Sequence, residues 1–180
     1  MLISRRFSIL LLPILCLIAV LSFPSAAKAL GPKGDAFVGY SRVDANAFYP
    51  NVGGLNGWQA ALHLKVRRFV GVEGDVAQYG LGANSTLPRT TTFMAGPKVS
   101  VGALGIKIFA HALAGGEHSA NSSGTAISGN AFAYALGGGV DARILPFFAW
   151  RVGADYINAP SISPSTGNHA RFSTGLVFRF

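Results

Sequence analysis

The sequence predicts an all-β fold, an eight-stranded antiparallel barrel, and three observations support that prediction. Hydrophobicity alternates with a period of two residues along the chain after position 30, as in strands, and not with the 3.6-residue period of helices. Eight such stretches are joined alternately by short and long connections. The composition, 50% hydrophobic and only 12% charged over 180 residues, excludes a coiled coil and a disordered tail.

Most of the predicted strands have the ~9–11 residues that a tilted strand needs to cross a bilayer. No apolar run long enough for a second helical span follows position 29. The predicted strands are 35–43, 56–66, 70–80, 92–101, 106–117, 130–142, 147–157 and 170–180.

The first three segments differ in how clearly they alternate. The segment 35–43 carries apolar residues on both faces, so its phase stays open. In the second segment Leu62 lies on the face opposite His63, and in the third Val72 lies opposite Glu73. These two segments therefore have one apolar face and one face with charged or polar groups.

The next three segments repeat this pattern. Phe93 and Lys98 take opposite faces of the fourth, and Ile108 and Lys107 take opposite faces of the fifth. The sixth alternates large residues such as Leu136 with Ala and Gly. Its run of three glycines at 137–139 has no helix pattern or Lys-Ser/Thr after it, so it indicates relief of crowding in a narrow barrel rather than a phosphate-binding loop.

The last two segments show which face is outside. Trp150 opposes Arg151 in the seventh, and Phe178 opposes Arg179 in the eighth. Alternation alone also suits a soluble sandwich or lipocalin, which buries its bulky apolar face. Here the opposite face is rich in Gly, Ala and Ser, which suits the narrow interior of eight strands. We therefore predict that the apolar face meets lipid, and that the strands close into a barrel because lipid cannot satisfy a free strand edge.

The ends of the predicted strands carry aromatic residues, as the interfacial girdles of membrane barrels do. The connections after the first, third, fifth and seventh segments are long and polar, and the other three are short. Both barrel termini then lie with the short turns, which face the periplasm in outer-membrane barrels. The residues expected in the girdles are Trp58, Tyr79, Phe93, Phe147, Trp150, Tyr156 and Phe178.

Residues 1–29 have the pattern of a secretory signal peptide, and residues 30–180 form the predicted barrel domain. Arg5 and Arg6 precede an apolar stretch, and Ala27-Lys28-Ala29 supplies a cleavage pattern. An uncleaved anchor is the alternative, because the apolar stretch is long for a signal. Cys16 is the chain's one cysteine, so the mature barrel is expected to hold no disulfide and no cysteine site.

Three motifs resemble those of small eight-stranded outer-membrane proteins, the OmpA-type transmembrane domain and the opacity-like family. They are FVGYS at 37–41, AYALGGGVD at 133–141 and GLVFRF at 175–180. The resemblance implies a bacterial outer-membrane protein whose terminal strand, through Leu176, Phe178 and Phe180, is recognised by the barrel-assembly machinery. OmpA-type proteins often continue into a peptidoglycan-binding domain, and no such domain is expected here.

Charged and polar residues on the inward face form a predicted interior cluster. It either plugs the lumen as a paired polar core, which is the expectation for a small barrel, or forms a proton or ion path. No metal or cofactor site is expected, because His63 and His111 lack any ligand spacing. The predicted cluster comprises His63, Lys65, Glu73, Asp75, Lys98, Lys107, His111, Glu117, Arg151 and Asp155.

No catalytic residues are expected, because consecutive residues such as Glu117, His118 and Ser119 point to opposite faces of a strand and cannot form a triad. The formal charge of +8 does not indicate nucleic acid, because the basic residues are dispersed without a stacking platform. Basic residues near the predicted outer rim are expected instead to contact lipopolysaccharide phosphates: Arg42, Arg89 and Arg171.

These observations predict a monomeric outer-membrane barrel with a structural or surface-interaction role through its four long loops. Three alternatives stay open. A narrow passive channel requires a continuous water path, an outer-membrane lipid-modifying enzyme requires a Ser, a His and a carboxylate converging on the outer wall, and a soluble periplasmic barrel would fold without detergent. Membrane lipid, lipopolysaccharide and the assembly machinery are the expected partners, and fold alone does not choose among the functions.

Overall fold

A computed structural model of the chain describes residues 33–44, 54–80, 89–120, 129–158 and 168–180. The predicted signal peptide, residues 1–29, lies outside the described residues. Among those described, no helix has the length and apolar character needed to cross a membrane. The strands are β1 (Gly34–Asp44), β2 (Leu55–Lys65), β3 (Val70–Tyr79), β4 (Arg89–Ala103), β5 (Ile106–Ala120), β6 (Gly129–Arg143), β7 (Phe148–Asn158) and β8 (Asn168–Arg179).

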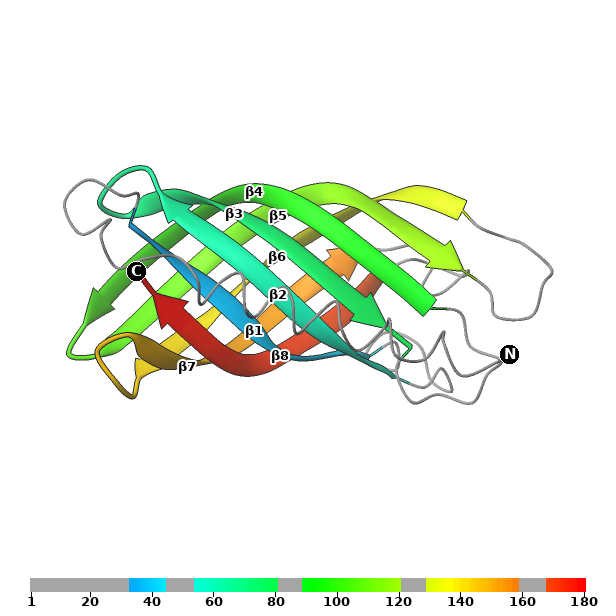
Figure 1. Cartoon of the computed structure of the whole chain (residues 1–180). Coiled ribbons are helices and arrows are strands. Elements are labelled where there is room, and N and C mark those ends of the chain that lie inside the picture. Colours follow the sequence, from blue (N-terminus) through cyan, green and yellow to red (C-terminus); the bar gives the residue numbers. More distant parts are fainter. Residues whose placement is uncertain (1–32, 45–53, 81–88, 121–128, 159–167) are drawn as a thin grey trace, which may run out of the picture. The chain divides into compact units, whose positions relative to one another are not determined.

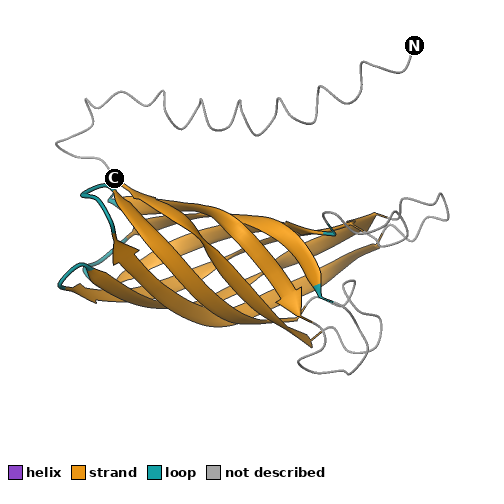
Figure 2. Ribbon diagram, turned by 90° about the horizontal axis from the view of Figure 1, so that it is seen from below, coloured by secondary structure: helices purple, strands orange, loops and turns teal. Residues whose placement is uncertain are grey.

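The eight strands form one closed antiparallel barrel in chain order, as Figures 1 and 2 show. The closing pair is β1 with β8, in a register that places Asp35 opposite Arg179 and Gly39 opposite Gly175. Every strand therefore has two neighbours, so no edge is left whose backbone groups would need water. The predicted all-β fold and strand number are confirmed.

The strand boundaries agree with the predicted ranges to within three residues. The largest differences concern β4 and β5, which have 15 residues each. They continue into the segments predicted as long loops, where Thr90 pairs with Ser119 and His118 pairs with Asn130. These extensions are polar on both faces, so the hydrophobic alternation that marks the rest of each strand does not reveal them.

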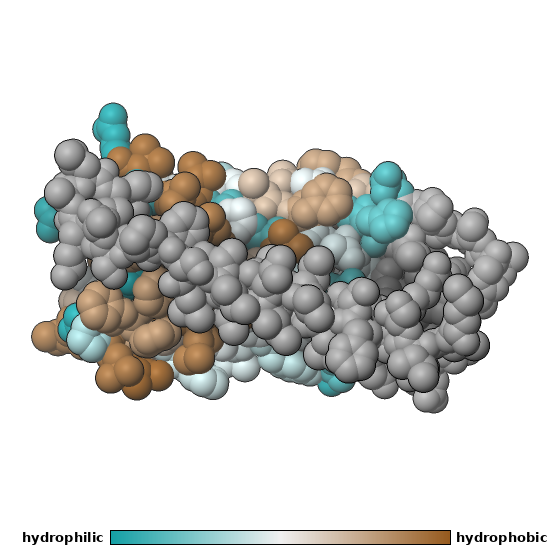
Figure 3. Space-filling view, viewed as in Figure 1, coloured by the Kyte–Doolittle hydropathy of each residue, from teal (hydrophilic) through white to brown (hydrophobic). Residues whose placement is uncertain are grey.

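The two faces of the wall are as predicted. Leu62 is 49% exposed and Leu176 is 44% exposed, whereas Arg151 is 3% and Asp155 is 7% exposed. Figure 3 shows hydrophobic residues on the visible part of the described wall. The bulky apolar side chains thus point outward and the charged ones inward, which is the arrangement of a membrane barrel and the reverse of a soluble one.

Two-residue and four-residue connections close one end of the barrel, which we call the turn end; the other is the loop end. In Figure 2 the teal turns lie at the same end as the C-terminus. Leu104 and Gly105 join β4 to β5, and both have positive φ, of 52° and 88°. Positive φ at both central residues is the conformation of a type I′ hairpin turn, whose twist matches that of the strands it joins.

Six of the seven predicted girdle aromatics are exposed on the outer face. Trp58 and Phe93 lie toward the loop end, and Phe147 and Trp150 lie toward the turn end. Tyr79 is the exception, because it is fully buried inside the barrel near Val43. The prediction for Tyr79 is wrong, since it lies in phase with the inward Glu73 and Asp75 and the aromatic side chain alone does not decide the face.

Candidate functional site

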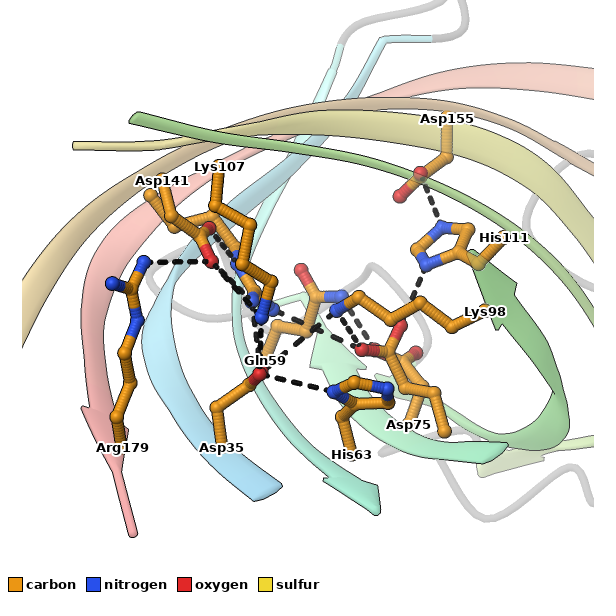
Figure 4. Close-up of polar contacts among 12 residues, drawn as sticks. Asp35, Gln59, His63, Asp75, Lys98, Lys107, His111, Asp141, Asp155 and Arg179 are labelled. Atoms are coloured by element: carbon orange, nitrogen blue, oxygen red, sulfur yellow. Dashed lines mark hydrogen bonds and ion pairs between the residues drawn. The ribbon is translucent and has the colours of Figure 1, made fainter. Parts of the chain in front are cut away.

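The lumen contains a connected set of charged and polar side chains, which we call the lumen network (Figure 4). Five carboxylates meet five Lys or Arg side chains and two histidines, and one glutamine joins them. The members are Asp35, Gln59, His63, Glu73, Asp75, Lys98, Lys107, His111, Asp141, Arg151, Asp155, Arg171 and Arg179.

Asp35 of β1 is the centre of the network toward the turn end. Its Oδ2 lies 3.0 Å from Nδ1 of His63 on the neighbouring strand β2. The same oxygen accepts a hydrogen bond of 2.5 Å from Nζ of Lys107, which comes from β5 across the lumen. Its Oδ1 accepts a bond of 3.1 Å from Nη2 of Arg151. One carboxylate thereby ties together strands that are not neighbours in the sheet.

Arg151 of β7 makes ion pairs and aromatic contacts at once. Its Nε donates to Oδ1 of Asp141 at 2.7 Å. Its guanidinium carbon lies 4.4 Å from the ring centroid of Phe109 and 5.0 Å from that of Phe37. Nζ of Lys98 lies 4.0 Å from the centroid of Phe109 as well. The two inward aromatic rings therefore pack the cations by cation–π contact in a space too narrow for water to surround them.

His111 of β5 connects the turn-end half of the network to the other half. Its Nδ1 lies 2.6 Å from Oε1 of Glu73, and its Nε2 lies 2.8 Å from Oδ1 of Asp155. Two hydrogen bonds to carboxylates need two N–H donors, which the imidazolium supplies. Glu73 also accepts a hydrogen bond from Lys98, so both of its oxygens are used. The geometry favours a positively charged His111 between two negative partners.

Arg171 of β8 holds the loop-end half of the network. Its Nε donates to Oδ2 of Asp155 at 2.7 Å, and its Nη1 donates to Oδ1 of Asp75 on β3 at 2.8 Å. The other oxygen of Asp75 accepts a bond of 2.5 Å from Nε2 of Gln59. Arg171 is 0% exposed, so its charge is balanced entirely inside the barrel.

Small residues on the inner face make room for these side chains. A Cβ at Gly137 would lie 2.0 Å from Oδ1 of Asp155, and one at Gly71 would lie 2.4 Å from Nε2 of His63. The lumen still holds a cavity of about 10 Å³, lined by Glu73, His111 and other members of the network. That volume is close to the minimum for one water molecule. Around Glu73 and His111 the lumen is thus filled by side chains of the lumen network.

Eight of the ten residues predicted for the interior cluster belong to the lumen network. Glu117 is also buried inside, nearer the loop end. Lys65 is exposed, so its prediction is wrong. It follows the inward phase of His63, but it is the last residue of β2 and its side chain leaves the barrel at the turn end.

Five inward residues of the lumen network are absent from the predicted interior cluster. Gln59, Asp141, Arg171 and Arg179 follow the inward phase of their strands, and that signal was sufficient to include them. Asp35 was missed because β1 has apolar residues on both faces. Phe37 lies inside and Val38 lies outside, so only the structure phases this strand.

The three predicted lipopolysaccharide contacts separate in the structure. Arg171 cannot reach lipopolysaccharide, because its guanidinium is buried in the lumen between two carboxylates, and its prediction is wrong. Arg42 is exposed on the outer wall toward the loop end and donates to Oδ1 of Asn56 at 3.2 Å. The side chain of Arg89 lies outside the described residues.

The residues weighed for catalysis and metal binding do not assemble into such a site. Glu117 is buried inside, whereas His118 is exposed on the opposite face, 2.9 Å from Asn130. His63 and His111 each face carboxylates of the lumen network. Among the described residues, no group of three or more His, Cys, Asp and Glu side chains could hold a metal ion.

Comparison by sequence identifies no relatives. No protein-family model matches the chain, and no curated protein matches it.

Comparison by structure finds small outer-membrane barrels. Neisserial surface protein A has a TM-score of 0.62 at 14% identity, over 82% of this chain and 96% of its own. Ail, the attachment invasion locus protein of Yersinia pestis, has a TM-score of 0.54 at 18% identity, over 84% of this chain and 100% of its own. The N-terminal barrel domain of Pseudomonas aeruginosa OprF has a TM-score of 0.53 at 13% identity, over 84% of this chain and 100% of its own.

These similarities establish the fold and do not identify a function. A transmembrane β-barrel designed de novo matches with a TM-score of 0.53 at 11% identity, which is as good as the natural OprF domain. The chain has the eight-stranded fold of bacterial outer-membrane proteins, and its apolar outer wall fits that membrane. Its function has to be argued from the lumen and from the two ends of the barrel.

Proposed function

We propose that this chain is a closed outer-membrane barrel whose role, structural or in surface interaction, is carried by its four long loops. The observation that supports this most strongly is the lumen network. Five carboxylates and five Lys or Arg side chains neutralise one another inside the wall, and the cavity among them has only about 10 Å³. A lumen packed in this way acts as a plug, so the working surface lies outside it.

The composition of the long loops supports a role at the surface that does not depend on charge. Residues 45–53, 81–88, 121–128 and 159–167 contain no Asp, Glu, Lys, Arg or His. They are rich in Ser, Asn, Gly and Pro, with the apolar Phe48, Tyr49 and Ile162 among them. Hydrogen bonds and apolar contacts are the interactions that such segments offer to a partner.

The names of two structural neighbours agree with a surface role. One is a surface protein, and the other is an attachment invasion protein. Ail was also solved with the heparin analogue sucrose octasulfate, which is densely anionic. The absence of Lys and Arg from all four long loops of this chain argues against carrying that ligand over.

Two partners belong to the same proposal. The guanidinium of Arg42 is exposed toward the loop end, and in this proposal it contacts a lipopolysaccharide phosphate. Leu176, Phe178 and Phe180 form an exposed apolar row at the end of β8, as a recognition signal for the barrel-assembly machinery requires. No catalytic role is proposed.

Conductance measurements distinguish the plug from the channel. The folded barrel, recognised by its heat-modifiable migration on gels, is inserted into planar bilayers beside a known porin. We expect no unitary conductance from this chain, because the paired charges fill the lumen. Stable, ion-selective steps would contradict the proposal and favour the narrow passive channel.

A loop replacement tests the surface role itself. Residues 45–53 and 121–128 are replaced by short Asn-Gly turns, and bacteria displaying either form are compared for attachment to cultured host cells. The proposal predicts that attachment falls while heat-modifiable migration is unchanged. Equal attachment by the two forms would argue against surface interaction through these loops.

A further inference from the structure

The charges on the outside of this barrel are distributed unequally between its ends. Almost every acidic residue is inside: six of the chain's seven Asp and Glu side chains are buried in the barrel, and the seventh is Asp44, toward the loop end. Five exposed cations, which we call the basic turn residues, lie at the turn end: Lys33, Lys65, Arg67, Arg68 and Arg143. Among the described side chains, no exposed carboxylate accompanies them.

The basic turn residues come from several parts of the chain. Lys33 and Lys65 are adjacent, because the backbone N–H of Lys65 donates to the carbonyl of Lys33 at 2.8 Å. Arg67 and Arg68 lie in the turn between β2 and β3. Arg143 ends β6, where its N–H donates to the carbonyl of Gly105 in another turn. The positive charge therefore extends around the barrel mouth and is not confined to one turn.

Apolar side chains occupy the turns themselves. Leu104 is 102% exposed at the tip of the β4–β5 turn, and its φ of 52° is a conformation that disfavours side chains other than Asn or Gly. Ile144 and Leu145 are exposed in the β6–β7 turn, and Phe69 is exposed in the β2–β3 turn. Turns in contact with water are ordinarily polar. These tips have the character of groups that contact an apolar medium.

Cations beside exposed apolar groups are typical of the lipid headgroup layer, where long basic side chains keep their charge at the phosphates and their stems in the hydrocarbon. The guanidinium of Arg68 lies 5.0 Å from the ring centroid of the exposed Phe69. In Figure 3 hydrophobic residues gather toward the end that carries the turns, with hydrophilic ones at its margin. A soluble acidic partner would be attracted by the charges but would leave the apolar tips unexplained.

We propose that the turn end is a binding surface for anionic phospholipid, with the basic turn residues on the phosphodiester groups and the apolar tips among the headgroups. The recognised chemistry is a phosphodiester without a compensating cation, as in phosphatidylglycerol, in contrast to a zwitterionic lipid. This inference rests on the placement of the barrel in a membrane and is independent of any role of the loops. The structure thus gives the two ends different tasks, since the long loops carry no charge.

The two tryptophans allow each end to be tested separately. Trp150 lies toward the turn end and Trp58 toward the loop end, and both face outward. Residues 30–180 are refolded as the Trp58→Phe and Trp150→Phe variants, so that one tryptophan reports on each end. Each is placed in phosphatidylcholine vesicles containing equal mole fractions of either brominated phosphatidylglycerol or brominated phosphatidylcholine. Quenching of fluorescence then measures which lipid is enriched beside that tryptophan.

We expect the association of phosphatidylglycerol beside Trp150 to exceed that of phosphatidylcholine by at least about threefold, and to fall to parity in high salt. Replacement of Lys65, Arg67, Arg68 and Arg143 by Gln should remove the preference. The matched control is Arg42→Gln, an exposed cation at the loop end, which should leave the preference beside Trp150 unchanged. Heat-modifiable migration verifies that every variant is folded.

Two results would overturn the proposal. One is equal quenching of Trp150 by the two lipids, which would instead direct attention to a soluble acidic partner. The other is a preference that survives in the four-residue variant or is lost equally in Arg42→Gln. Neither result depends on conductance or on attachment, so a failure here is distinguishable from a failure of the proposed function.

Discussion

Arg171 shows how much a single inward residue contributes to this barrel. It joins Asp75 and Asp155 from strands on different sides of the lumen, and it is fully buried. Strand alternation correctly predicted its inward face, but its position near a long loop suggested the outer rim. Alternation was the better guide, because the period of two holds up to the last residues of a strand and shows which face each side chain takes. Closeness to a loop in the sequence does not show whether a side chain lies in the lumen or at the outer rim.

Removal of the Arg171 charge should be strongly destabilising. Arg171→Met leaves the buried Asp75 without a cation and leaves Asp155 with His111 alone, and we expect the free energy of unfolding in urea to fall by about 3–5 kcal/mol. Arg42→Met, which removes an exposed cation, should change it by less than about 0.5 kcal/mol. Adding Asp75→Asn and Asp155→Asn to Arg171→Met should restore part of the loss. Equal effects of the two arginine variants would show that the ion pairs of Arg171 are not formed.

Two strand glycines, Gly137 and Gly74, should respond oppositely to substitution by alanine. A Cβ at Gly137 would collide with Asp155, whereas a Cβ at Gly74 has nothing within 4 Å and lies on the outer face. Gly137→Ala should therefore lower the free energy of unfolding by about 1–3 kcal/mol. Gly74→Ala should leave it unchanged or raise it by up to about 1 kcal/mol. Both values come from urea titrations followed by gel migration, and a reversed order would contradict the inward position of Gly137.

For seven of the eight strands the sequence predicted which face points outward, and it left the phase of β1 open. β2 to β8 set bulky apolar residues against small or charged ones, so one face was readable in each. β1 was not readable, because Phe37 faces inward as a cation–π partner of Arg151 while Val38 and Tyr40 face lipid. The turns were located correctly from the chain, but the exposure of Lys65 at the end of β2 depends on where the wall ends, which alternation does not indicate.

The outward phase of β1 has a measurable consequence. Val38 lies near the middle of the strand and is exposed on the wall, so Val38→Arg should lower the free energy of unfolding in vesicles by about 2–4 kcal/mol. Leu104→Arg at the turn end should cost only about 0–1 kcal/mol, because that position lies at the interface. A larger loss for Leu104→Arg than for Val38→Arg would contradict the depths assigned to these two positions.

In the barrel as a whole, closure of the sheet and filling of the lumen act together to hold the eight strands. The β1–β8 pair removes the last strand edge, and the lumen network crosslinks strands that the sheet does not pair, as Arg171 does between β8 and β3. The sequence predicted this architecture because membrane and lumen demand opposite chemistry on alternate residues. It could not predict which ion pairs form, because contacts across a lumen depend on the register of all eight strands at once.

The proposed assembly signal can be tested by substitutions that keep the backbone hydrogen bonds between Phe180 and Gly34. Phe178→Ala with Phe180→Ala should slow insertion in proteoliposomes that contain the barrel-assembly machinery by about tenfold, equivalent to about 1.4 kcal/mol in the barrier. Spontaneous folding into detergent should change little, because both side chains are exposed. Equal slowing in detergent would assign these aromatics to barrel stability instead of recognition.

The surroundings of the chain's two tryptophans show whether the apolar face of the barrel meets lipid or water. Trp58 and Trp150 are the only ones, and both lie on the face assigned to lipid. In vesicles, chain-brominated lipids should quench nearly all the tryptophan fluorescence, and aqueous iodide should quench little of it. Fluorescence quenched by iodide and insensitive to brominated chains would mean that this face meets water, and it would contradict the membrane barrel described here.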